Sequence, residues 1–193
     1  MREAAILAGG QARRYGGRDK SRLLVGGRTI LDRQIEALTP CVSRIMLVGA
    51  RHDGVSDPRV VPVDDRVGNR GPLGGLDAAL QAASGPVLLL ACDMPFVTTA
   101  LLAGLFAKLD DMDVVVPRTE HGYHPLCAVF APQCRGPVRA RLDAGQLRMR
   151  DLLTDLRVRT VEGDALAQFG EVHRLLANVN SQTDLDALEL QNH

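Results

Sequence analysis

Aromatic residues, net charge and long apolar runs are all scarce in this sequence, and each scarcity excludes a class of protein. Phe, Trp and Tyr make up 3% of the 193 residues, and Trp is absent, which argues against an aromatic stacking platform for single-stranded nucleic acid. The 23 basic residues are balanced by 23 acidic ones, so the basic surplus typical of nucleic-acid-binding proteins is missing too. No apolar run approaches the length that spans a bilayer. We therefore expect neither a nucleic-acid nor a membrane partner.

Cysteine is also sparse, and its spacing excludes two kinds of structural site. The four residues Cys41, Cys92, Cys127 and Cys134 form no Cys-x-x-Cys pair, which argues against a structural zinc site or a disulfide framework. Small buried thiols in a reducing cytosol are the simplest account of them. The chain enters an apolar stretch directly after Met1 to Glu3, without a signal segment. We expect a cytoplasmic protein.

The apolar pattern predicts an α/β fold. Seven short runs read as strands: Ala4–Ala8, Ile45–Val48, Val60–Val63, Val87–Ala91, Val114–Val116, Leu126–Phe130 and Val158–Val161. Helical spacing of leucines appears over Thr29–Leu38, Pro72–Ala83 and Thr98–Leu109, and Thr29 with Asp32 resembles a capping box. Strands alternating with helices predict one domain over residues 1–193, with a mostly parallel sheet and helices on both faces. A tight polar turn and a last helix are expected from Asn178 onward.

The loop after the first strand has the composition of a phosphate-binding loop. Gly9 and Gly10 let a ligand approach the main chain, and Arg14 and Lys20 supply positive charge. Neither a Walker loop nor a Gly-x-Gly-x-x-Gly fingerprint is present. Arg14 and Lys20 are our candidates for binding a triphosphate, and the alternative is a glycine turn with solvated cations.

Asp93 is the most informative single residue, because it ends the most apolar strand, Val87–Ala91. Ligands of open parallel sheets bind at the carboxyl ends of the strands. A carboxylate there either caps the next element or binds Mg²⁺ together with substrate phosphates. A metal and an opposing lysine would stabilise the charge that develops in a nucleotidyl transfer.

Other polar residues leave two interpretations open. Asp64 and Asp65 follow the third strand and either contact a ribose or base or shape a turn. His124 either faces a substrate or lies on the polar surface. The arginines of residues 135–150 form either a solvated helix face or a contact to an anionic acceptor.

Five motifs extend over nearly the whole chain in a fixed order. They are Leu7-Ala8-Gly9-Gly10 with its Arg13-Arg14-Tyr15-Gly16-Gly17 and Asp19-Lys20 continuation, Gly71-Pro72-Leu73-Gly74-Gly75-Leu76, Cys92-Asp93-Met94-Pro95, His124-Pro125, and Asn178-Val179-Asn180-Ser181. Together they closely resemble the molybdenum cofactor guanylyltransferases, which are nucleotidyltransferases with a three-layer Rossmann-like fold. One departure is the run Leu47-Val48-Gly49-Ala50-Arg51, where some relatives have an asparagine after the second strand.

The resemblance implies transfer of GMP from GTP to the phosphate of molybdopterin, with Mg²⁺ as cofactor and pyrophosphate as the second product. Residues 1–116 would mainly bind the nucleotide and residues 117–193 mainly the acceptor. The implied nucleotide-binding residues are Leu7, Ala8, Gly9, Gly10, Lys20, Asp65 or its neighbour Asp64, Gly74 and Asp93, which also binds the metal; Arg14, Lys20 and Asp93 are the catalytic set. His124, Asn178 and Asn180 would lie toward the pterin.

Three alternatives remain. A cytidylyltransferase for the same cofactor and a sugar-phosphate nucleotidyltransferase would use the same loops. A non-catalytic nucleotide sensor or cofactor chaperone would have less need of a metal-binding carboxylate. Cofactor-inserting proteins and molybdoenzymes are the expected downstream partners of the enzyme.

Overall fold

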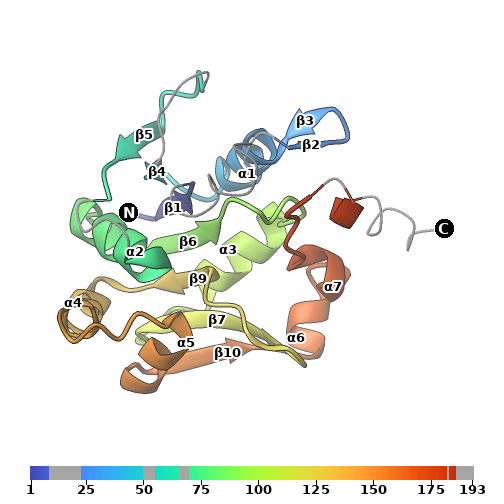
Figure 1. The fold of residues 1–193 in the computed structure, drawn as a ribbon. Coiled ribbons are helices and arrows are strands. Elements are labelled where there is room, and N and C mark those ends of the chain that lie inside the picture. The colour runs from blue at the N-terminus through green and yellow to red at the C-terminus, as the bar shows by residue number, and fades with distance from the viewer. Residues whose placement is uncertain (9–22, 50–54, 66–69, 182, 186–193) are drawn as a thin grey trace.

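The computed structural model describes residues 1–8, 23–49, 55–65, 70–181 and 183–185. Within these ranges, no helix has the length and apolar character needed to cross a membrane. Three layers are visible, with a central sheet between two groups of helices (Figure 1).

The central sheet has eight strands in the order β10-β7-β9-β6-β1-β4-β5, and β8 pairs with β7 outside this path. Their bounds are β1 Glu3–Leu7, β4 Arg44–Val48, β5 Val60–Val63, β6 Val87–Ala91, β7 Val114–Thr119, β8 Gly122–Tyr123, β9 Cys127–Phe130 and β10 Val158–Val161. A separate two-stranded hairpin joins β2 (Leu24–Val25) to β3 (Arg28–Thr29). Pairing is parallel from β6 through β1 and β4 to β5, and between β7 and β10. Only β9 runs antiparallel to both neighbours on the path, β6 and β7.

The helices cover the two faces of this sheet because side chains along each strand alternate between faces. Ala4, Ile6, Leu88 and Leu90 pack on one side, and Ala5 and Leu89 on the other. The first side is covered by α1 (Ile30–Leu38), α3 (Thr99–Ala107), α6 (Asp164–Ala167) and α7 (Val172–Leu175). The second is covered by α2 (Gly71–Ala82), α4 (Arg135–Asp143) and α5 (Met149–Leu152). The predicted mostly parallel sheet with helices on both faces is thus confirmed.

The individual elements agree with the sequence pattern to within a few residues. All seven predicted strands and all three predicted helices are present. Thr29 and Thr98 are the N-caps of α1 and α3, and the Thr29 side chain accepts from Asp32 N at 3.0 Å. The apolar pattern did not predict β2, β3, β8, the 3₁₀ turns η3 (Pro132–Cys134) and η4 (Leu153–Asp155), or the helices α4 to α7, of which α4 is as long as α1 and α3. Residues 183–185 are helical, and the rest of the expected last helix lies outside the described residues.

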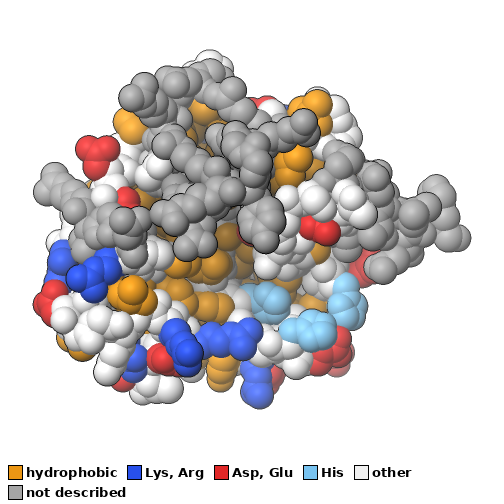
Figure 2. Space-filling view, in the orientation of Figure 1, with side chains coloured by type: hydrophobic (Ala, Val, Ile, Leu, Met, Phe, Trp, Pro, Cys, Tyr) orange, Lys and Arg blue, Asp and Glu red, His pale blue; other side chains and the backbone are white. Residues whose placement is uncertain are grey.

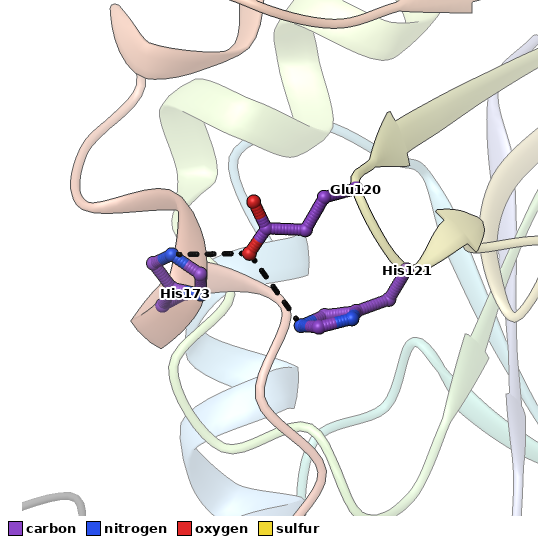
Figure 3. A group of neighbouring side chains, drawn as sticks. All are labelled: Glu120, His121 and His173. Atoms are coloured by element: carbon purple, nitrogen blue, oxygen red, sulfur yellow. Dashed lines mark ion pairs between the residues drawn. The ribbon is translucent and has the colours of Figure 1, made fainter.

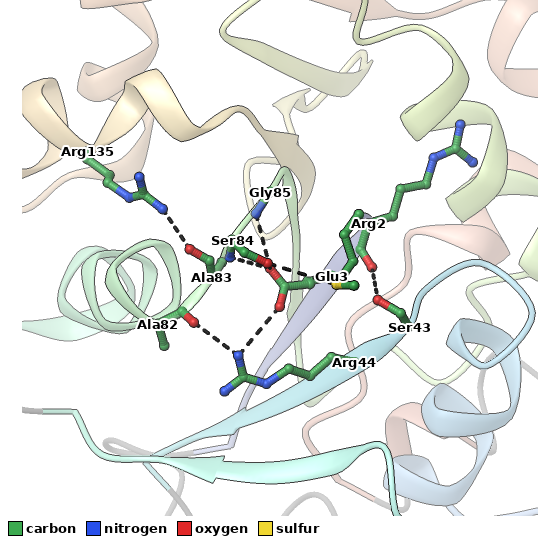
Figure 4. A network of polar contacts seen from close by, with 10 residues as sticks. Arg2, Glu3, Ser43, Arg44, Ala82, Ala83, Ser84, Gly85 and Arg135 are labelled. Atoms are coloured by element: carbon green, nitrogen blue, oxygen red, sulfur yellow. Dashed lines mark hydrogen bonds and ion pairs between the residues drawn. The ribbon is translucent and has the colours of Figure 1, made fainter.

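A buried glutamate fastens the first strand to the turn before β6 (Figure 4). The Glu3 side chain is 1% exposed, and its carboxylate accepts from Ser84 N at 2.7 Å and Gly85 N at 3.2 Å. Arg44 lies 3.5 Å from the same carboxylate and also donates to Ala82 O at 3.0 Å. Gly85 leaves no room for a side chain, since a Cβ there would lie 2.1 Å from Met1 O. The network fixes the start of β1, at the end of the strand away from Ala8.

Candidate active site

Hydrogen bonds hold the carboxyl ends of the central strands in one row. Cys92 N donates to Leu7 O at 3.3 Å, and Ala8 N donates to Val48 O at 3.1 Å. On the far side of β6, Ala91 N donates to Leu126 O at 2.9 Å. Because β9 is antiparallel, it begins at the edge where β6 ends. The residues that follow β1 and β6 and those that precede β9 therefore meet at one edge.

Asp93 lies at the centre of this edge, and its loop is held from two sides. From α1, the buried Gln34 side chain donates to Ala91 O at 2.8 Å and to Met94 O at 3.0 Å. From the C-terminal part, Val179 N donates to Asp93 O at 2.7 Å. Val179 is fully buried. The bond therefore fixes the Asn178-Val179-Asn180 turn beside Asp93.

The expected nucleotide-binding residues Leu7, Asp65 and Gly74 cluster at the first turns of α2. A Cβ added to Gly75 would lie 2.6 Å from Leu7 Cδ2, so the Leu7 side chain rests on the helix backbone there. A Cβ added to Gly74 would lie 3.4 Å from Asp65 Oδ1 and 3.1 Å from Arg70 Cβ. Asp65 is half-buried against this turn, whereas Asp64 is exposed. Of the two aspartates, Asp65 is the one in contact with the second glycine motif.

A pocket of about 1070 Å³ opens beside Asp93. It brings together three of the predicted residues, Asp93, His124 and Asn178, which come from β6, the β8–β9 connection and the C-terminal turn. Pro72 at the start of α2 also lines it, as do Arg148 and Arg150. Figure 2 shows hydrophobic side chains in the middle of this face, bordered by histidines and by arginines. The pocket has the size and composition of a small-molecule site.

His124 is half-buried, and a 2.9 Å hydrogen bond joins its Nε2 to Thr119 Oγ1. Burial, and secondarily the positive charge of Arg150 and the nearby His121, lower the pKa of His124 from its usual value. The neutral imidazole is therefore favoured in the folded protein, as a group that donates and accepts hydrogen bonds rather than as a fixed cation.

The basic stretch at residues 135–150 divides into two groups, which the sequence could not separate. Arg135 donates to Leu80 O and Ala83 O, Arg139 donates to the buried Asp77 carboxylate at 2.7 Å, and Arg141 bonds Asp155. These three arginines bond to neighbouring elements, although Arg139 is still 45% exposed. Arg148 and Arg150 are exposed and line the pocket, so they are the members available to an anionic ligand.

Other predicted residues lie elsewhere. Gly9, Gly10, Arg14 and Lys20 are outside the described residues. Asn180 is exposed and does not line the pocket; its backbone N–H donates to Asp184 Oδ2 at 2.8 Å. Sequence reasoning missed Gln34, whose only signal was a polar residue on the apolar face of α1.

Cys92, Cys127 and Cys134 are buried free thiols, whereas Cys41 is a free thiol that is only partly buried. Burial raises the pKa of the Cys127 thiol to about 12, and burial likewise raises that of Cys134 to about 12. At neutral pH both are protonated thiols within the core, which fits a structural rather than a catalytic role.

Comparison with known proteins identifies the family of the chain. The chain is 30% identical over 186 residues to a molybdenum cofactor guanylyltransferase from Desulfosudis oleivorans, with 95% of this chain and 92% of the relative covered. It is 34% identical over 185 residues to a probable molybdenum cofactor guanylyltransferase from Pelotomaculum thermopropionicum, with 93% and 88% covered. Among solved structures, molybdopterin-guanine dinucleotide biosynthesis protein A from Archaeoglobus fulgidus has the same fold, with a TM-score of 0.80, 22% identity and 98% of both chains covered.

The family model described as the MobA-like NTP transferase domain matches residues 4–161, which contain the central sheet except for Glu3, the first residue of β1. The sequence resemblance and the expectation of a nucleotidyltransferase are both confirmed. This chain belongs to the MobA-like NTP transferase family.

Proposed function

We propose that this protein transfers GMP from GTP to the phosphate of molybdopterin, producing the guanine dinucleotide form of the molybdenum cofactor and pyrophosphate. Family membership and the names of the relatives support this reaction. One structural observation supports placing this reaction at the pocket beside Asp93. Hydrogen bonds connect the Asp93 loop to Leu7 on one side and to the asparagine turn on the other, so the expected nucleotide and acceptor residues share one edge.

In the proposed reaction, an oxygen of the acceptor phosphate attacks the α-phosphorus of GTP. A new P–O bond forms, the bond from the α-phosphorus to the oxygen bridging to the β-phosphate breaks, and pyrophosphate leaves with the bonding electrons. The acceptor supplies the nucleophile, so the protein need only bind, align and neutralise charge. Leu7, Ala8, Asp65, Gly74 and Asp93 are the described residues that we assign to the nucleotide.

Asp93 fits the demands of a magnesium ion. It offers carboxylate oxygens at the end of β6 beside a pocket, and Mg²⁺ in such sites takes one or two carboxylates together with phosphate oxygens and water. When bound there, Mg²⁺ would withdraw charge from the phosphate oxygens. For Gly9, Gly10, Arg14 and Lys20, the proposed contacts to the phosphates rest on the sequence alone.

Residues 117–193, the expected acceptor-binding half, contribute most of the remaining pocket wall. His124 and Asn178 supply neutral hydrogen-bonding groups, and Arg148 and Arg150 supply positive charge. We assign this wall, in residues 117–193, to an anionic pterin, and the strands of residues 1–116 to the nucleotide. We assign Asn180 to the acceptor side as well, as part of the Asn178-Val179-Asn180 turn. The four free thiols are consistent with the cytoplasm as the location.

The direct test is incubation of the full chain with molybdenum-loaded molybdopterin, Mg²⁺ and either GTP or CTP. We expect pyrophosphate and a dinucleotide with GTP. Turnover with CTP alone would assign the protein to the cytidylyl branch. Turnover only with a sugar phosphate as the acceptor would indicate the sugar nucleotide alternative. Tight GTP binding without turnover would support a nucleotide sensor.

Replacing Asp93 by Asn tests the proposed metal ligand. The substitution keeps the shape of the side chain and removes its charge, so we expect the rate to fall by about 100-fold or more while circular dichroism stays unchanged. The matched control is Asp111→Asn, at an exposed aspartate that pairs only loosely with Arg157, at 3.9 Å. Wild-type rates in Asp93→Asn would show that the carboxylate only shapes its loop.

A further inference from the structure

Two histidines and a glutamate converge at the border of the pocket (Figure 3). Glu120 and His121 occupy the turn between β7 and β8, and His173 lies on α7. Glu120 Oε1 is 3.6 Å from His121 Nε2 and 3.7 Å from His173 Nε2. One ligand atom from each residue lies within 4.8 Å of the others. His173 is 52 positions from its neighbour His121 along the chain, so the fold brings it to the adjacent pair Glu120 and His121.

These distances are too long for hydrogen bonds and suit a shared metal ion. Zinc bonds to imidazole nitrogen and carboxylate oxygen at about 2.0–2.2 Å. Two ligands at a tetrahedral angle are then about 3.4 Å apart. The two separations from Glu120 exceed this value by only a few tenths of an ångström. All three ligand atoms lie within 4.8 Å of one another, so rotation of the exposed side chains can bring them to a shared ion. Two imidazoles and one carboxylate are also the ligand set of several three-ligand zinc sites.

The backbone under each ligand is fixed, so little order has to be gained on binding. His121 N donates to Thr119 Oγ1 at 3.2 Å, and His121 O accepts from Arg150 at 3.2 Å. On α7, Leu175 is buried in the core and Val172 packs against the same cluster, which leaves His173 on the outer side. The three side chains are well exposed, and an ion can reach them without opening the fold.

We propose that Glu120, His121 and His173 form a binding site for a divalent transition-metal ion of the zinc type. The site is separate from the magnesium assigned to Asp93, because Mg²⁺ prefers oxygen ligands and imidazole favours zinc and its neighbours. Three protein ligands leave a coordination position for water. Because His121 and His173 both line the pocket, a bound ion would fasten the β7–β8 turn to α7 across two parts of its wall.

Zinc binding should be measured on the full chain without a polyhistidine tag, by competition with a zinc-sensitive chelating dye in excess Mg²⁺. We expect one zinc ion to bind per chain, with an affinity that depends on Glu120, His121 and His173. His173→Ala and Glu120→Gln should each weaken binding by at least about 10-fold, as expected for loss of one ligand of three. The matched control is Glu162→Gln, which removes an exposed glutamate paired with Arg118 and should leave zinc affinity unchanged.

A second readout separates a metal site from a cluster of ion pairs. Zinc should raise the melting temperature of the wild-type protein and should have a smaller effect on His173→Ala or on the second variant His173→Gln. Equal zinc affinity in the wild type and all cluster variants would overturn the proposal, as would equal weakening by Glu162→Gln. Failure of the guanylyl transfer assay would not affect either outcome, since zinc binding is measured without substrates.

Discussion

The loop that carries Asp93 is held in place by the side chain of Gln34 on α1. Gln34 is fully buried, and both of its donated hydrogen bonds go to carbonyls of the Asp93 loop, at Ala91 and Met94. From the same helix, Arg33 donates to Pro95 O at 3.2 Å. Helix α1 therefore acts on the site without touching the pocket.

Replacing Gln34 by Leu should affect both stability and turnover. The substitution leaves two carbonyls without their donor, which costs about 1–3 kcal/mol of unfolding free energy. It also loosens the Asp93 loop, so we expect kcat to fall more than KM rises. Denaturant unfolding and steady-state kinetics measure the two effects. Gln168→Leu is the matched control, because that side chain bonds only to Ala165 O within its own surface turn. Equal kinetics in the two variants would argue against a positioning role.

His124 provides a titration that reports on the pocket. Its pKa is lowered mainly by burial and secondarily by Arg150, so its contribution to stability is present above about pH 6.5 and decreases as the pH falls below that value. We expect Arg150→Met to move the pKa of His124 upward, but not fully to its usual value, because burial remains. NMR titration of the ring protons measures this shift. A pKa that does not move would mean that Arg150 is too far away or too well solvated to act.

At the scale of elements, helix α4 is fastened to α2 by arginines. Arg135 donates to carbonyls at the end of α2, and Arg139 pairs with Asp77 in its middle. The Asp77 side chain is 3% exposed, whereas that of Arg139 is 45% exposed. Pro72, in the first turn of α2, lines the pocket. By holding α2, Arg135 and Arg139 therefore help to position that part of the pocket wall.

Arg139→Met should destabilise the protein because it leaves the buried Asp77 carboxylate without its cation. We expect a loss of about 1–3 kcal/mol, below the range for a fully buried pair, since Arg139 is partly solvated. The double variant Asp77→Leu with Arg139→Met removes both charges and should recover most of this loss. Urea unfolding of the single and double variants checks it. No recovery in the double variant would show that Arg139 acts through packing instead of charge.

The sequence predicted those helices whose own residues show a helical repeat of apolar side chains or a capping residue. Helices α1, α2 and α3 show the 3.6-residue repeat of apolar residues, and Thr29 and Thr98 mark two of their starts. Helix α4 buries only Val138 and Leu142, so it leaves no such repeat. The roles of Arg135 and Arg139 depend on partners more than 50 residues away, which local reasoning cannot find.

At the scale of the whole molecule, the strands were predictable and their order was not. Apolar runs identify β6 and β9 as buried strands, but insertion of β9 between β6 and β7 is decided by side-chain packing across the whole sheet. The same applies to the site. Asp93 and His124 were identified by residue type and resemblance, whereas the Glu120, His121 and His173 cluster exists only once α7 lies beside the β7–β8 turn.

The acid stability of the whole fold should depend on Asp113, which joins three segments. Its carboxylate accepts from Arg157 at 2.8 Å and 3.0 Å and from Gln133 at 3.1 Å, and the side-chain hydrogen bond from Arg157 is the largest cause that lowers its pKa to about 2. A depressed carboxyl pKa contributes stability above the unfolded value of about 3.9, and that contribution is lost as the pH falls toward 2. Asp113→Asn should thus be less stable than wild type at neutral pH, and the difference should shrink toward pH 2 in denaturant unfolding. A difference independent of pH would contradict this.

The antiparallel strand β9 also dictates the order in which a growing chain can complete the sheet. By residue 91, synthesis has delivered β1, β4, β5 and β6, which pair among themselves. The next strand, β7, pairs among the described strands only with β8, β9 and β10, all made after it. Strand β7 can therefore join the sheet only after residues 127–130 have been made, because these residues form β9 and pair with both β6 and β7. The pocket needs still later residues, since Arg148, His173 and Asn178 also line it. It is therefore completed only when nearly the whole chain has been made.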